Sequence, residues 1–442
     1  AKLGLAPISC YRTRNLALTF SRLGAEAGMR NGRRVVITGI GVVAPNGIGK
    51  QAYWDSLVSG KSGVDWITEF DTDPYPCKVA AKVQDFNPGD FVSAKQARHM
   101  GRFSQFAVAA CRMALEDSGL ASTPLLTKEA TVCFGTSGGA PIFEKAAVDF
   151  QLGGMKAVDP WTALEYPPHA PASYVSIELG ITGSTISVSS NCCTGLDALQ
   201  TAALQVRSGR TKLAFTGSAE APISPALFAT FSALGALSRR SDDPTKASRP
   251  YDLLRDGLVI GEGSAAFILE DLEHARDRGA TIYAEVRGFG GASEAIDMRK
   301  GDLTGKVMAK AINAAIQDAG VEPNNIDHVN AHGSSLPDFD VCDSNAFKEA
   351  LGEHAYRIPI SSIKSMIGQP FAAAGALQAA AACLSIVNQQ VPPTINQEVP
   401  DPRCDLDYVP NVSRVVRLRN VLANGHGFGG GCSAMVLGRL DE

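Results

Sequence analysis

The sequence predicts an α/β protein made of two similar halves, with helices packed on and between two sheets in a layered α/β/α/β/α arrangement. A Ser-Ser pair at 189–190 precedes a small-residue helical run with Ala-Leu-Gln at 198–200, and a second pair at 361–362 precedes a similar run with Ala-Leu-Gln at 376–378. The matching segments lie about 180 residues apart, which is the pattern of an internal repeat.

Each half also begins with an apolar run that leads into a Gly-x-Gly triplet, at 35–41 and at 283–290. We interpret each triplet as a glycine turn that ends a strand. A nucleotide site would need a third glycine opening a helix, and Val42 to Pro45 stand there instead. The triplet at 39–41 is therefore weak support for nucleotide binding.

Apolar periodicity places the other elements. We expect helices at 50–58, 95–120, 196–206, 307–319 and 372–387, strands at 130–135, 184–188, 213–217 and 265–269, and mainly loop at 63–95 and 239–255. The predicted halves are residues 29–280 and 281–442. Residues 1–28 form a basic extension, which is a presequence remnant, an upstream extension or an added tail.

The composition describes an ordinary globular protein. Of 442 residues, 45% are apolar and 19% are charged, and the net charge is only −4. Nothing here favours nucleic acid or an anionic membrane as a partner, so a basic docking site must be local. The longest apolar run, 372–387, carries Gly375 and Gln378, so we expect a buried helix and no membrane span.

The ten cysteines include no CxxC pair and lie mostly in apolar runs. This usage predicts reduced thiols in a cytosol-like compartment, with an organelle as the alternative if residues 1–28 are a presequence remnant. The cysteine spacing indicates no structural zinc site.

A cysteine turn spans residues 189–195, between the apolar run 184–188 and the helical run 196–206. This pattern is typical of a strand, a tight turn and a helix. It places the thiol of Cys192 at a helix N-terminus, where unpaired N–H groups and the helix dipole favour the nucleophilic thiolate. We interpret Cys193 as packing.

Three other segments carry candidate partners for this thiol. His332 follows an apolar strand in a small-residue turn, although a solvent-facing histidine is the alternative. Lys364 lies among apolar and hydroxyl residues, with a snorkelling lysine as the alternative. The segment 424–431 contains five glycines, which lets backbone N–H groups approach a ligand unless it is a plain loop.

Together these segments resemble the β-ketoacyl-acyl carrier protein synthases, condensing enzymes of fatty acid and polyketide assembly with a thiolase-like fold. The resemblance runs from about Arg33 to Leu440. It rests on the cysteine turn and on ordered motifs at 33–41, 248–250, 255–263, 330–333, 392–396 and 405–411.

The resemblance implies a role for each candidate. Cys192 is expected to accept the acyl chain, His332 to polarise the extender thioester, and Lys364 to support the site. Asp343 stands where the family often has Glu. Phe428 matches the family's gate in the glycine loop, and its N–H with that of Cys192 would form the oxyanion hole.

The sequence departs from the family pattern at several positions. Gln369 replaces the second catalytic His, and an amide can donate a hydrogen bond but cannot exchange a proton near neutral pH. Ser334 to Leu336 replace two Thr and a Ser that bind the pantetheine arm, so one hydroxyl is lost. His426 and Cys432 replace Phe and Asn. We hypothesise that His426 faces the pocket as a second imidazole or narrows the acyl tunnel.

Gly138 falls near a pocket position where many relatives carry a larger aliphatic residue, which predicts room for a long or bulky acyl chain. Lys95, Arg98 and Arg102 are spaced to share one helical face and match a region that docks the acidic carrier protein; a solvated face is the alternative.

The resemblance implies no metal or organic cofactor, an acyl carrier protein as partner, and a homodimer or a heterodimer with a chain-length factor. Because Gln369 leaves decarboxylation in doubt, two alternatives remain. The chain is then either a non-catalytic partner subunit of that kind or an acyltransferase that does not decarboxylate.

Overall fold

The computed structural model describes residues 32–120 and 128–440. The predicted extension at 1–28 lies outside the described residues. Ten strands form one continuous path, and β2 (Gly47–Ile48) pairs with β1 beside it. The path consists of two half-sheets that meet where β1 and β9 exchange two residue pairs, Val36 with Glu285 and Ile37 with Ala284.

The two half-sheets have the same topology, which confirms the predicted duplication. The first runs in the order β6 (Thr185–Val188), β5 (Thr131–Gly135), β7 (Leu213–Glu220), β8 (Gly263–Asp271), β1 (Val35–Ala44). The second runs β11 (Ile360–Ser361), β10 (His328–Asn330), β14 (Asn420–His426), β15 (Gly431–Gly438), β9 (Ala284–Ser293). Strand directions also correspond, because β5 and β10 are each parallel to both neighbours while the other pairings within each half are antiparallel. The division of the chain at residues 280 and 281 stays a proposal about domains.

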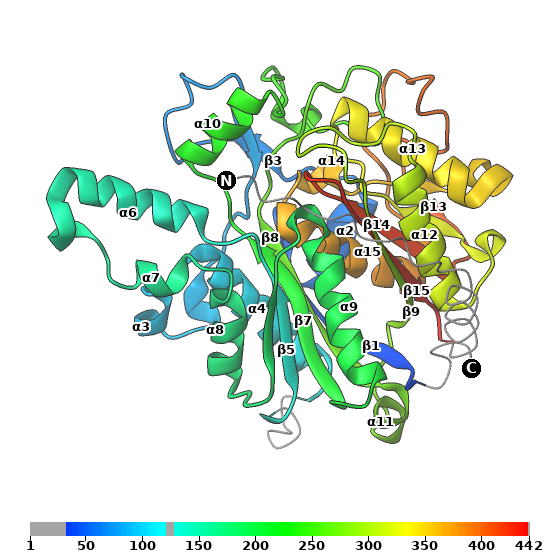
Figure 1. The fold of residues 1–442 in the computed structure, drawn as a ribbon, viewed down its shortest axis with the longest axis horizontal. Helices are drawn as coiled ribbons and strands as arrows, with labels where there is room; N and C mark the ends of the chain where they lie inside the picture. The colour runs from blue at the N-terminus through cyan, green and yellow to red at the C-terminus, as the bar shows by residue number, and fades with distance from the viewer. Residues whose placement is uncertain (1–31, 121–127, 441–442) are drawn as a thin grey trace, which may run out of the picture.

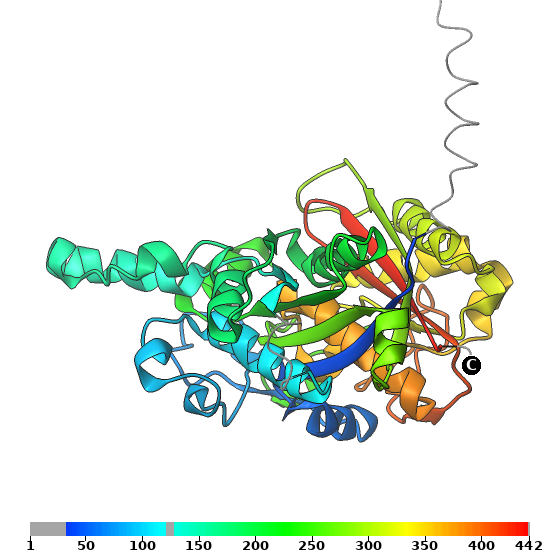
Figure 2. The ribbon, with the colours of Figure 1, turned by 90° about the horizontal axis from the view of Figure 1, so that it is seen from below.

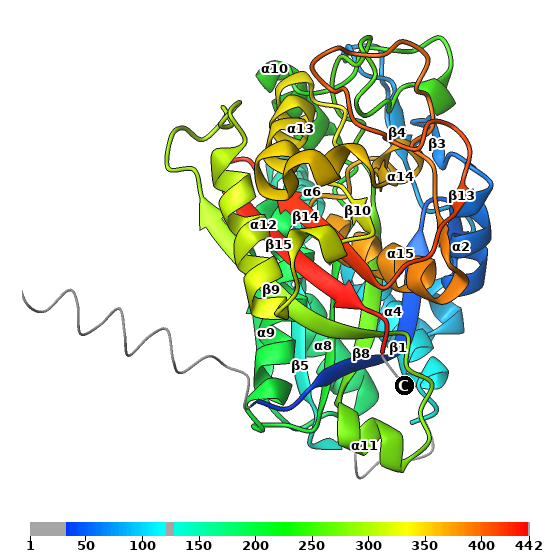
Figure 3. The ribbon, with the colours of Figure 1, turned by 90° about the vertical axis from the view of Figure 1, so that its right-hand side faces the viewer.

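Five layers result from this repeat (Figure 1). Helices α9 (Thr194–Arg207) and α15 (Ala374–Asn388) contact each other between the half-sheets. The first half is covered outside by α4 (Arg102–Asp117) and α8 (Ala170–Leu179), and the second by α12 (Lys306–Ala319) with α13 (Pro337–Leu351) beside it. Figure 3 shows β14 and β15 between α12 and α15. The predicted α/β/α/β/α arrangement is confirmed.

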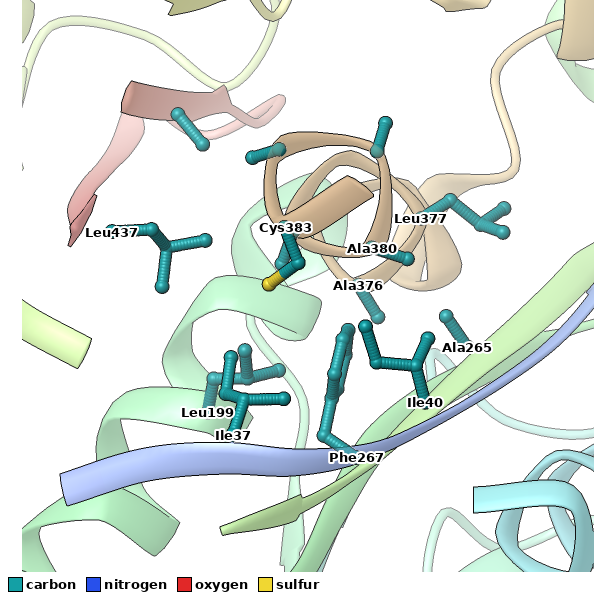
Figure 4. Close-up of a cluster of buried hydrophobic side chains, with 14 of the residues drawn as sticks. Ile37, Ile40, Leu199, Ala265, Phe267, Ala376, Leu377, Ala380, Cys383 and Leu437 are labelled. Atoms are coloured by element: carbon teal, nitrogen blue, oxygen red, sulfur yellow. The ribbon is translucent and has the colours of Figure 1, made fainter. Parts of the chain in front are cut away.

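The central core is built around the small side chains of α15 (Figure 4). Ala376, Ala380 and Cys383 face Leu199 of α9 and Phe267 of β8 at close range, because small residues let helix and sheet approach. The segment Phe371–Asn388 is long and apolar enough to cross a membrane, but 89% of its apolar window is buried inside the protein. The prediction of a buried helix is correct.

The prediction that the two Gly-x-Gly triplets are turns is wrong, because both lie within strands. Gly39 and Gly41 lie within the continuous strand β1, and Gly290 lies within β9. A Cβ on Gly41 would lie 1.9 Å from the carbonyl oxygen of Ala110 in α4, and one on Gly290 would lie 1.9 Å from that of Ala311 in α12. Each glycine therefore lets an outer helix pack directly on its half-sheet, and both halves repeat this contact.

The predicted helix at 95–120 is two helices, α3 (Ala94–Ala97) and α4. The break coincides with a tertiary contact, since the N–H of Gly101 donates to the carboxylate of Glu165 at 2.6 Å and Gly101 itself is extended. Figure 2 shows α6 (Ala140–Gly153) projecting from the body as an arm.

The remaining elements are short. The helices are α2 (Lys50–Val58), α7 (Thr162–Glu165), α10 (Pro225–Leu234), α11 (Leu272–Asp277) and α14 (Lys364–Ile367). The 3₁₀ turns are η1 (Pro88–Asp90), η2 (Gly154–Ala157), η3 (Asn191–Cys193), η4 (Pro244–Lys246), η5 (Pro323–Asn325), η6 (Gly352–Tyr356) and η7 (Phe371–Ala373). The short strands β3 (Val64–Trp66) and β4 (Val79–Ala81) pair with each other, as do β12 (Gln390–Val391) and β13 (Arg414–Val415).

Candidate active site

The cysteine turn is a strand, a tight turn and a helix, as predicted. Strand β6 ends at Val188, η3 carries Cys192, and α9 follows at once. Asn191 has φ +56°, in the left-handed region, so the backbone turns sharply just before the cysteine. Cys193 points the other way and donates its S–H toward the carbonyl oxygens of Gly425 and Gly431 at 3.3 and 3.2 Å. Its predicted packing role agrees with this placement.

Cys192 is only 3% exposed. Its Sγ lies 3.0 Å from Nε2 of Gln369, which donates to it, and 3.2 Å from Oδ1 of Asn191. Burial raises the pKa of Cys192 to about 11, and the Gln369 hydrogen bond and the Lys364 charge oppose this only in part. The expectation of a resting thiolate is therefore wrong, because loss of hydration outweighs the helix N-terminus.

Gln369, which stands where the resemblance places a second catalytic histidine, touches the thiol of Cys192. Its backbone is fixed, since its N–H donates to Val259 at 2.7 Å and its carbonyl oxygen accepts from Gly261 at 3.1 Å. The side chain is buried and Oε1 has no hydrogen-bond partner among the described residues. The amide thus presents its donor to the sulfur and leaves one acceptor free for a substrate group.

Lys364 is fully buried at the start of α14, so the snorkelling alternative is wrong. Its Nζ donates to the carbonyl oxygen of His332 at 2.6 Å and to Oε1 of Gln378 at 2.9 Å. Burial lowers the pKa of Lys364 to about 8, although the Asp343 carboxylate opposes the shift. The lysine fixes the backbone from which His332 projects.

His332 follows β10 and is 1% exposed, which excludes the solvent-facing alternative. Its N–H donates to Oδ1 of Asn424 at 2.9 Å, while its ring Nδ1 has no partner among the described residues. Burial, together with the Lys364 charge, holds the pKa of His332 well below its usual range. The imidazole is therefore neutral near pH 7 and can donate one N–H to a substrate oxygen.

Asp343 holds the backbone next to His332 and lines none of the pockets described. It accepts from the N–H of Gly333 at 2.8 Å, from Nδ2 of Asn424 at 2.9 Å and from the Tyr251 hydroxyl at 3.2 Å, with no exposed surface. All its described contacts are to the protein. A direct contact of Asp343 with substrate would compete with these bonds, so its placement fits a positioning role.

Ser334 is also withdrawn into the protein. Its N–H donates to Asp340 at 2.9 Å, and its hydroxyl oxygen accepts from the N–H of Leu336 at 3.4 Å. Leu336, where the predicted hydroxyl is lost, packs in the apolar cluster that contains Cys192 and Phe428. The predicted contact of Ser334 with a pantetheine arm would compete with this internal bond.

The glycine loop lies directly against Cys192. A Cβ on Gly427 would lie 3.5 Å from the backbone nitrogen of Cys192, and Gly429 and Gly430 have φ +89° and +79°, which favours glycine. In the described part of the chain, no hydrogen-bond acceptor is present for the N–H of Cys192 or of Phe428. An oxyanion hole requires backbone donors that are free in this way.

Phe428 closes one side of the site. Its ring packs 5.4 Å from that of Phe339 and 6.2 Å from that of Phe231. Beyond it lies a pocket of about 340 Å³, lined by Ser137, Gly138, Ala140, Pro141, Ser189, Asn191, Glu220, Pro222, Leu227, Phe231 and Phe371. The pocket starts beside the nucleophile and includes the predicted Gly138, which is consistent with an acyl-binding role.

Glu220 is a pocket residue that the sequence analysis missed. Its side chain is buried and accepts from the N–H of Ser137 at 2.9 Å. Burial raises the pKa of Glu220 to about 7. The signal was an acidic residue three positions after the predicted strand 213–217. Gln378, missed likewise, was visible as an amide within an alanine-rich helix.

His426 does not reach the nucleophile, contrary to our hypothesis. The ring is fully buried, packs 4.4 Å from Phe339 and lies 6.3 Å from the ring of His332. Its Nε2 is 3.0 Å from Oε1 of Glu294, on the far side of the loop. Because β14 carries this side chain toward Glu294, it does not replace the imidazole lost at Gln369.

The three residues predicted to dock the carrier protein have different surroundings in the structure. Lys95 and Arg98 are exposed and form no ion pair within the described residues. Arg102 instead binds the buried carboxylate of Glu262, with its Nη2 2.7 Å from Oε1, and lies over the ring of Phe106. The predicted common helical face does not exist because α3 and α4 are separate, and docking of a carrier protein by Arg102 would compete with its ion pair to Glu262.

Comparisons with known proteins agree with this geometry. The family model described as beta-ketoacyl synthase, N-terminal domain, matches residues 32–275, and the C-terminal domain model of the same family matches residues 283–398. The chain belongs to the β-ketoacyl synthase family. As a β-ketoacyl synthase, it is a condensing acyltransferase.

This β-ketoacyl synthase is similar to proteins of both polyketide and fatty acid synthesis. It is 44% identical to the tetracenomycin polyketide synthase ketoacyl synthase alpha subunit of Streptomyces glaucescens, over 93% of this chain and 98% of that one. It is 40% identical to 3-oxoacyl-[acyl-carrier-protein] synthase 2 of Coxiella burnetii, over 92% and 99%.

Solved structures give the same result. A type II PKS acyl-carrier protein in complex with its ketosynthase bound to the hexaketide matches with TM-score 0.86 and 36% identity, over 93% of this chain and all of that one. The ishigamide ketosynthase/chain length factor matches with TM-score 0.87 and 34% identity over the same shares. This β-ketoacyl synthase thus has the thiolase-like fold that the sequence resemblance implied.

Proposed function

We propose that this β-ketoacyl synthase accepts an acyl group from an acyl carrier protein onto Cys192 and extends it with a malonyl unit. The observation that carries the proposal is the buried Cys192 thiol, held by Gln369 at 3.0 Å and next to two free backbone donors. The adjacent 340 Å³ pocket supports binding of the acyl chain. Enzymes of this family act on carrier-bound substrates without an additional cofactor.

The proposed reaction has two balanced steps. The Cys192 sulfur attacks the acyl thioester, the bond between the acyl carbon and the carrier sulfur breaks, and the thiol proton passes to the released carrier thiol. Decarboxylation of the malonyl unit then releases carbon dioxide and leaves the electron pair of the broken C–C bond as an enolate. The enolate carbon attacks the acyl carbon, which forms the new C–C bond and breaks the bond to the Cys192 sulfur. Cys192 leaves as thiolate and regains a proton from solvent.

Each residue has a distinct part in this proposal. The N–H groups of Cys192 and Phe428 stabilise the oxyanion of the tetrahedral intermediate, an effect worth about 3 to 4 kcal/mol per donor. His332, neutral because it is buried, donates to the extender carbonyl. Gln369 adds a second donor at the same place, and Lys364 positions His332.

Gln369 favours a second candidate, an acyltransferase that does not decarboxylate. An amide donates to the enolate oxygen but offers no charge that a proton can tune, so stabilisation of the enolate is weaker than with two histidines. The partner-subunit alternative has less support, because Cys192, His332 and Lys364 are all retained in a bonded arrangement.

The proposed partners are an acyl carrier protein and a second subunit, either a copy of this chain or a chain-length factor. The solved complex of a ketosynthase with its acyl-carrier protein supports the carrier as a partner. The projecting helix α6 supports a second subunit. Its segment exposes large apolar side chains, with Phe143 57%, Phe150 56%, Leu152 85% and Met155 84% exposed. Apolar exposure on this scale is typical of an interface.

We also propose a cytoplasmic location, since the compared relatives are bacterial biosynthetic enzymes. The organelle alternative has no support from these relatives. It depended on residues 1–28, which lie outside the described part of the chain.

Mass spectrometry of the intact protein tests the proposal. Acyl-carrier protein should add one acyl mass to the parent and to Cys193→Ala, but not to Cys192→Ala. Malonyl-carrier protein should then remove the adduct, release carbon dioxide and yield a β-ketoacyl carrier. An adduct that persists without carbon dioxide release supports the acyltransferase, and the absence of any adduct supports the partner subunit.

A further inference from the structure

A group of metal-ligating side chains lies behind the glycine loop, away from Cys192. Glu294 follows β9, Cys342 lies on α13 and His426 ends β14. Their ligand atoms all lie within 4.8 Å of one another, and all three residues are buried. The reaction proposed above uses none of them.

Several of these polar atoms have no partner. Oε2 of Glu294 and both ring nitrogens of His426 form no hydrogen bond among the described residues. Nε2 of His426 is 3.0 Å from Oε1 of Glu294, but the pair is not aligned as a hydrogen bond. The two side chains are 0% and 1% exposed. Oε1 of Glu294 does accept from the N–H of Asp302 at 3.0 Å, so the unsatisfied atoms are Oε2 and the two imidazole nitrogens. Burying these atoms without partners is costly, and a ligand between them would satisfy them.

A fourth donor lies on the neighbouring strand. Cys432 of β15 is paired with His426 of β14 in antiparallel register, and directly opposed residues place their side chains on the same face. Cys432 is 2% exposed, and its Sγ makes only a long contact of 3.7 Å to the carbonyl oxygen of Gly430. Its thiol is therefore available on the face that carries the His426 ring.

We propose that Glu294, Cys342 and His426, with Cys432 as fourth ligand, bind a zinc ion or a similar thiophilic divalent cation. Sulfur and imidazole donors favour zinc, whereas magnesium and calcium prefer oxygen ligands. Tetrahedral zinc holds its ligand atoms about 3.3 to 3.8 Å apart, so the three side chains need to close only slightly around it. Each cysteine that binds loses its thiol proton to solvent.

The ion would stabilise the structure and take no part in condensation. Glu294 donates its N–H to the carbonyl oxygen of Gly430 at 2.9 Å, and His426 lies two residues before Phe428. A cation here would tie the end of β9, α13 and β14 to the glycine loop and so limit movement of the gate. The proposal does not depend on the proposed reaction. It revises the expectation of no zinc site, because the four ligands come from distant segments.

Cobalt binding provides the test. The full chain carrying Cys192→Ala, which removes the reactive thiol, is treated with a chelator, dialysed and titrated with Co²⁺. We expect one equivalent to bind with the near-ultraviolet absorption of a thiolate–Co²⁺ bond, Zn²⁺ to displace it, and Zn²⁺ to raise the unfolding temperature. Cys342→Ser and His426→Phe should weaken binding more than the roughly 10- to 100-fold lost with an outer-shell partner.

Matched variants make the outcome decisive. Cys111→Ala removes a buried thiol on α4 and should leave binding unchanged. If His426→Phe fails to fold by circular dichroism, Glu294→Gln, which keeps the side-chain shape, takes its place. The proposal is overturned if no thiolate band appears, or if the band survives in folded Cys342→Ser and Glu294→Gln.

Discussion

Nε2 of Gln369 lies 3.0 Å from Sγ of Cys192, in a site where both side chains are buried. The amide therefore orients the thiol and lowers its pKa, but burial still leaves that pKa at about 11. A histidine at this position could also exchange a proton, whereas an amide cannot near neutral pH. This contact makes residue 369 the place to test how much of the condensation chemistry remains.

Restoring the histidine should increase decarboxylation. We expect Gln369→His to release carbon dioxide from malonyl-carrier protein faster than the parent, by up to about 10²-fold, because an imidazole adds proton exchange to hydrogen bonding. Gln369→Asn, which stays an amide, is the control and should not gain. Equal rates in the parent and in folded Gln369→His would mean that residue 369 does not limit this step.

Removing the buried lysine should destabilise the site. Lys364→Met leaves the carbonyl oxygen of His332 and Oε1 of Gln378 without their donor, at about 1 to 3 kcal/mol each. Urea unfolding measures this cost, and Lys61→Met, at an exposed lysine, should be near neutral.

The stability lost in Lys364→Met should also depend on pH. The pKa of Lys364 falls to about 8 in the folded protein from its ordinary 10.5. Between these values the unfolded chain binds more protons, so the lysine's contribution to stability rises with pH. The stability difference between parent and Lys364→Met should therefore widen from pH 8 to pH 10. A difference that narrows would contradict a buried lysine with a lowered pKa.

The pocket carboxyl Glu220 should make stability depend on pH in the opposite direction. Its pKa is raised from 4.5 to about 7 by burial, so its stabilising contribution is complete below pH 4.5 and is lost as pH rises through 7. Relative to Glu220→Gln, the parent should lose up to about 3 kcal/mol between pH 5 and 8. Thermal unfolding at both pH values measures this, and Glu353→Gln, at an exposed site, should behave as the parent. Parallel curves for parent and Glu220→Gln would refute the raised pKa.

The basic residues near α3 should divide into two classes. Lys95→Glu with Arg98→Glu should weaken binding of the acidic carrier at low salt and flatten its salt dependence, because exposed charges act through screened attraction. Arg102→Ala should instead lower the unfolding temperature, since it leaves buried Glu262 unpaired. Arg210→Glu with Lys310→Glu controls for total charge. If the Lys95 and Arg98 pair binds carrier no differently from that control, the docking proposal fails.

Local patterns were enough for much of the site. The turn around Cys192 was predicted from the residues themselves, because β-formers, a tight turn and helical spacing follow each other within a few positions. Ordered motifs then indicated His332, Lys364 and Gln369 together. The shared face of Lys95, Arg98 and Arg102 was predicted on the assumption of one continuous helix over residues 95–120, and the structure has two helices there. A hydrogen bond from Gly101 to the distant Glu165 lies at the break between these helices.

The sequence by itself determined the class of fold, the repeat, the turn that carries Cys192 and the family, because each is recorded in periodicity or in motifs along the chain. Only the tertiary structure decided the protonation of Cys192 and the direction of His426. Both depend on what packs around the side chain: burial raises the thiol pKa to about 11, and β14 turns the imidazole toward Glu294. Desolvation and contacts between distant segments arise only when the two halves close on each other, so no local pattern carries them.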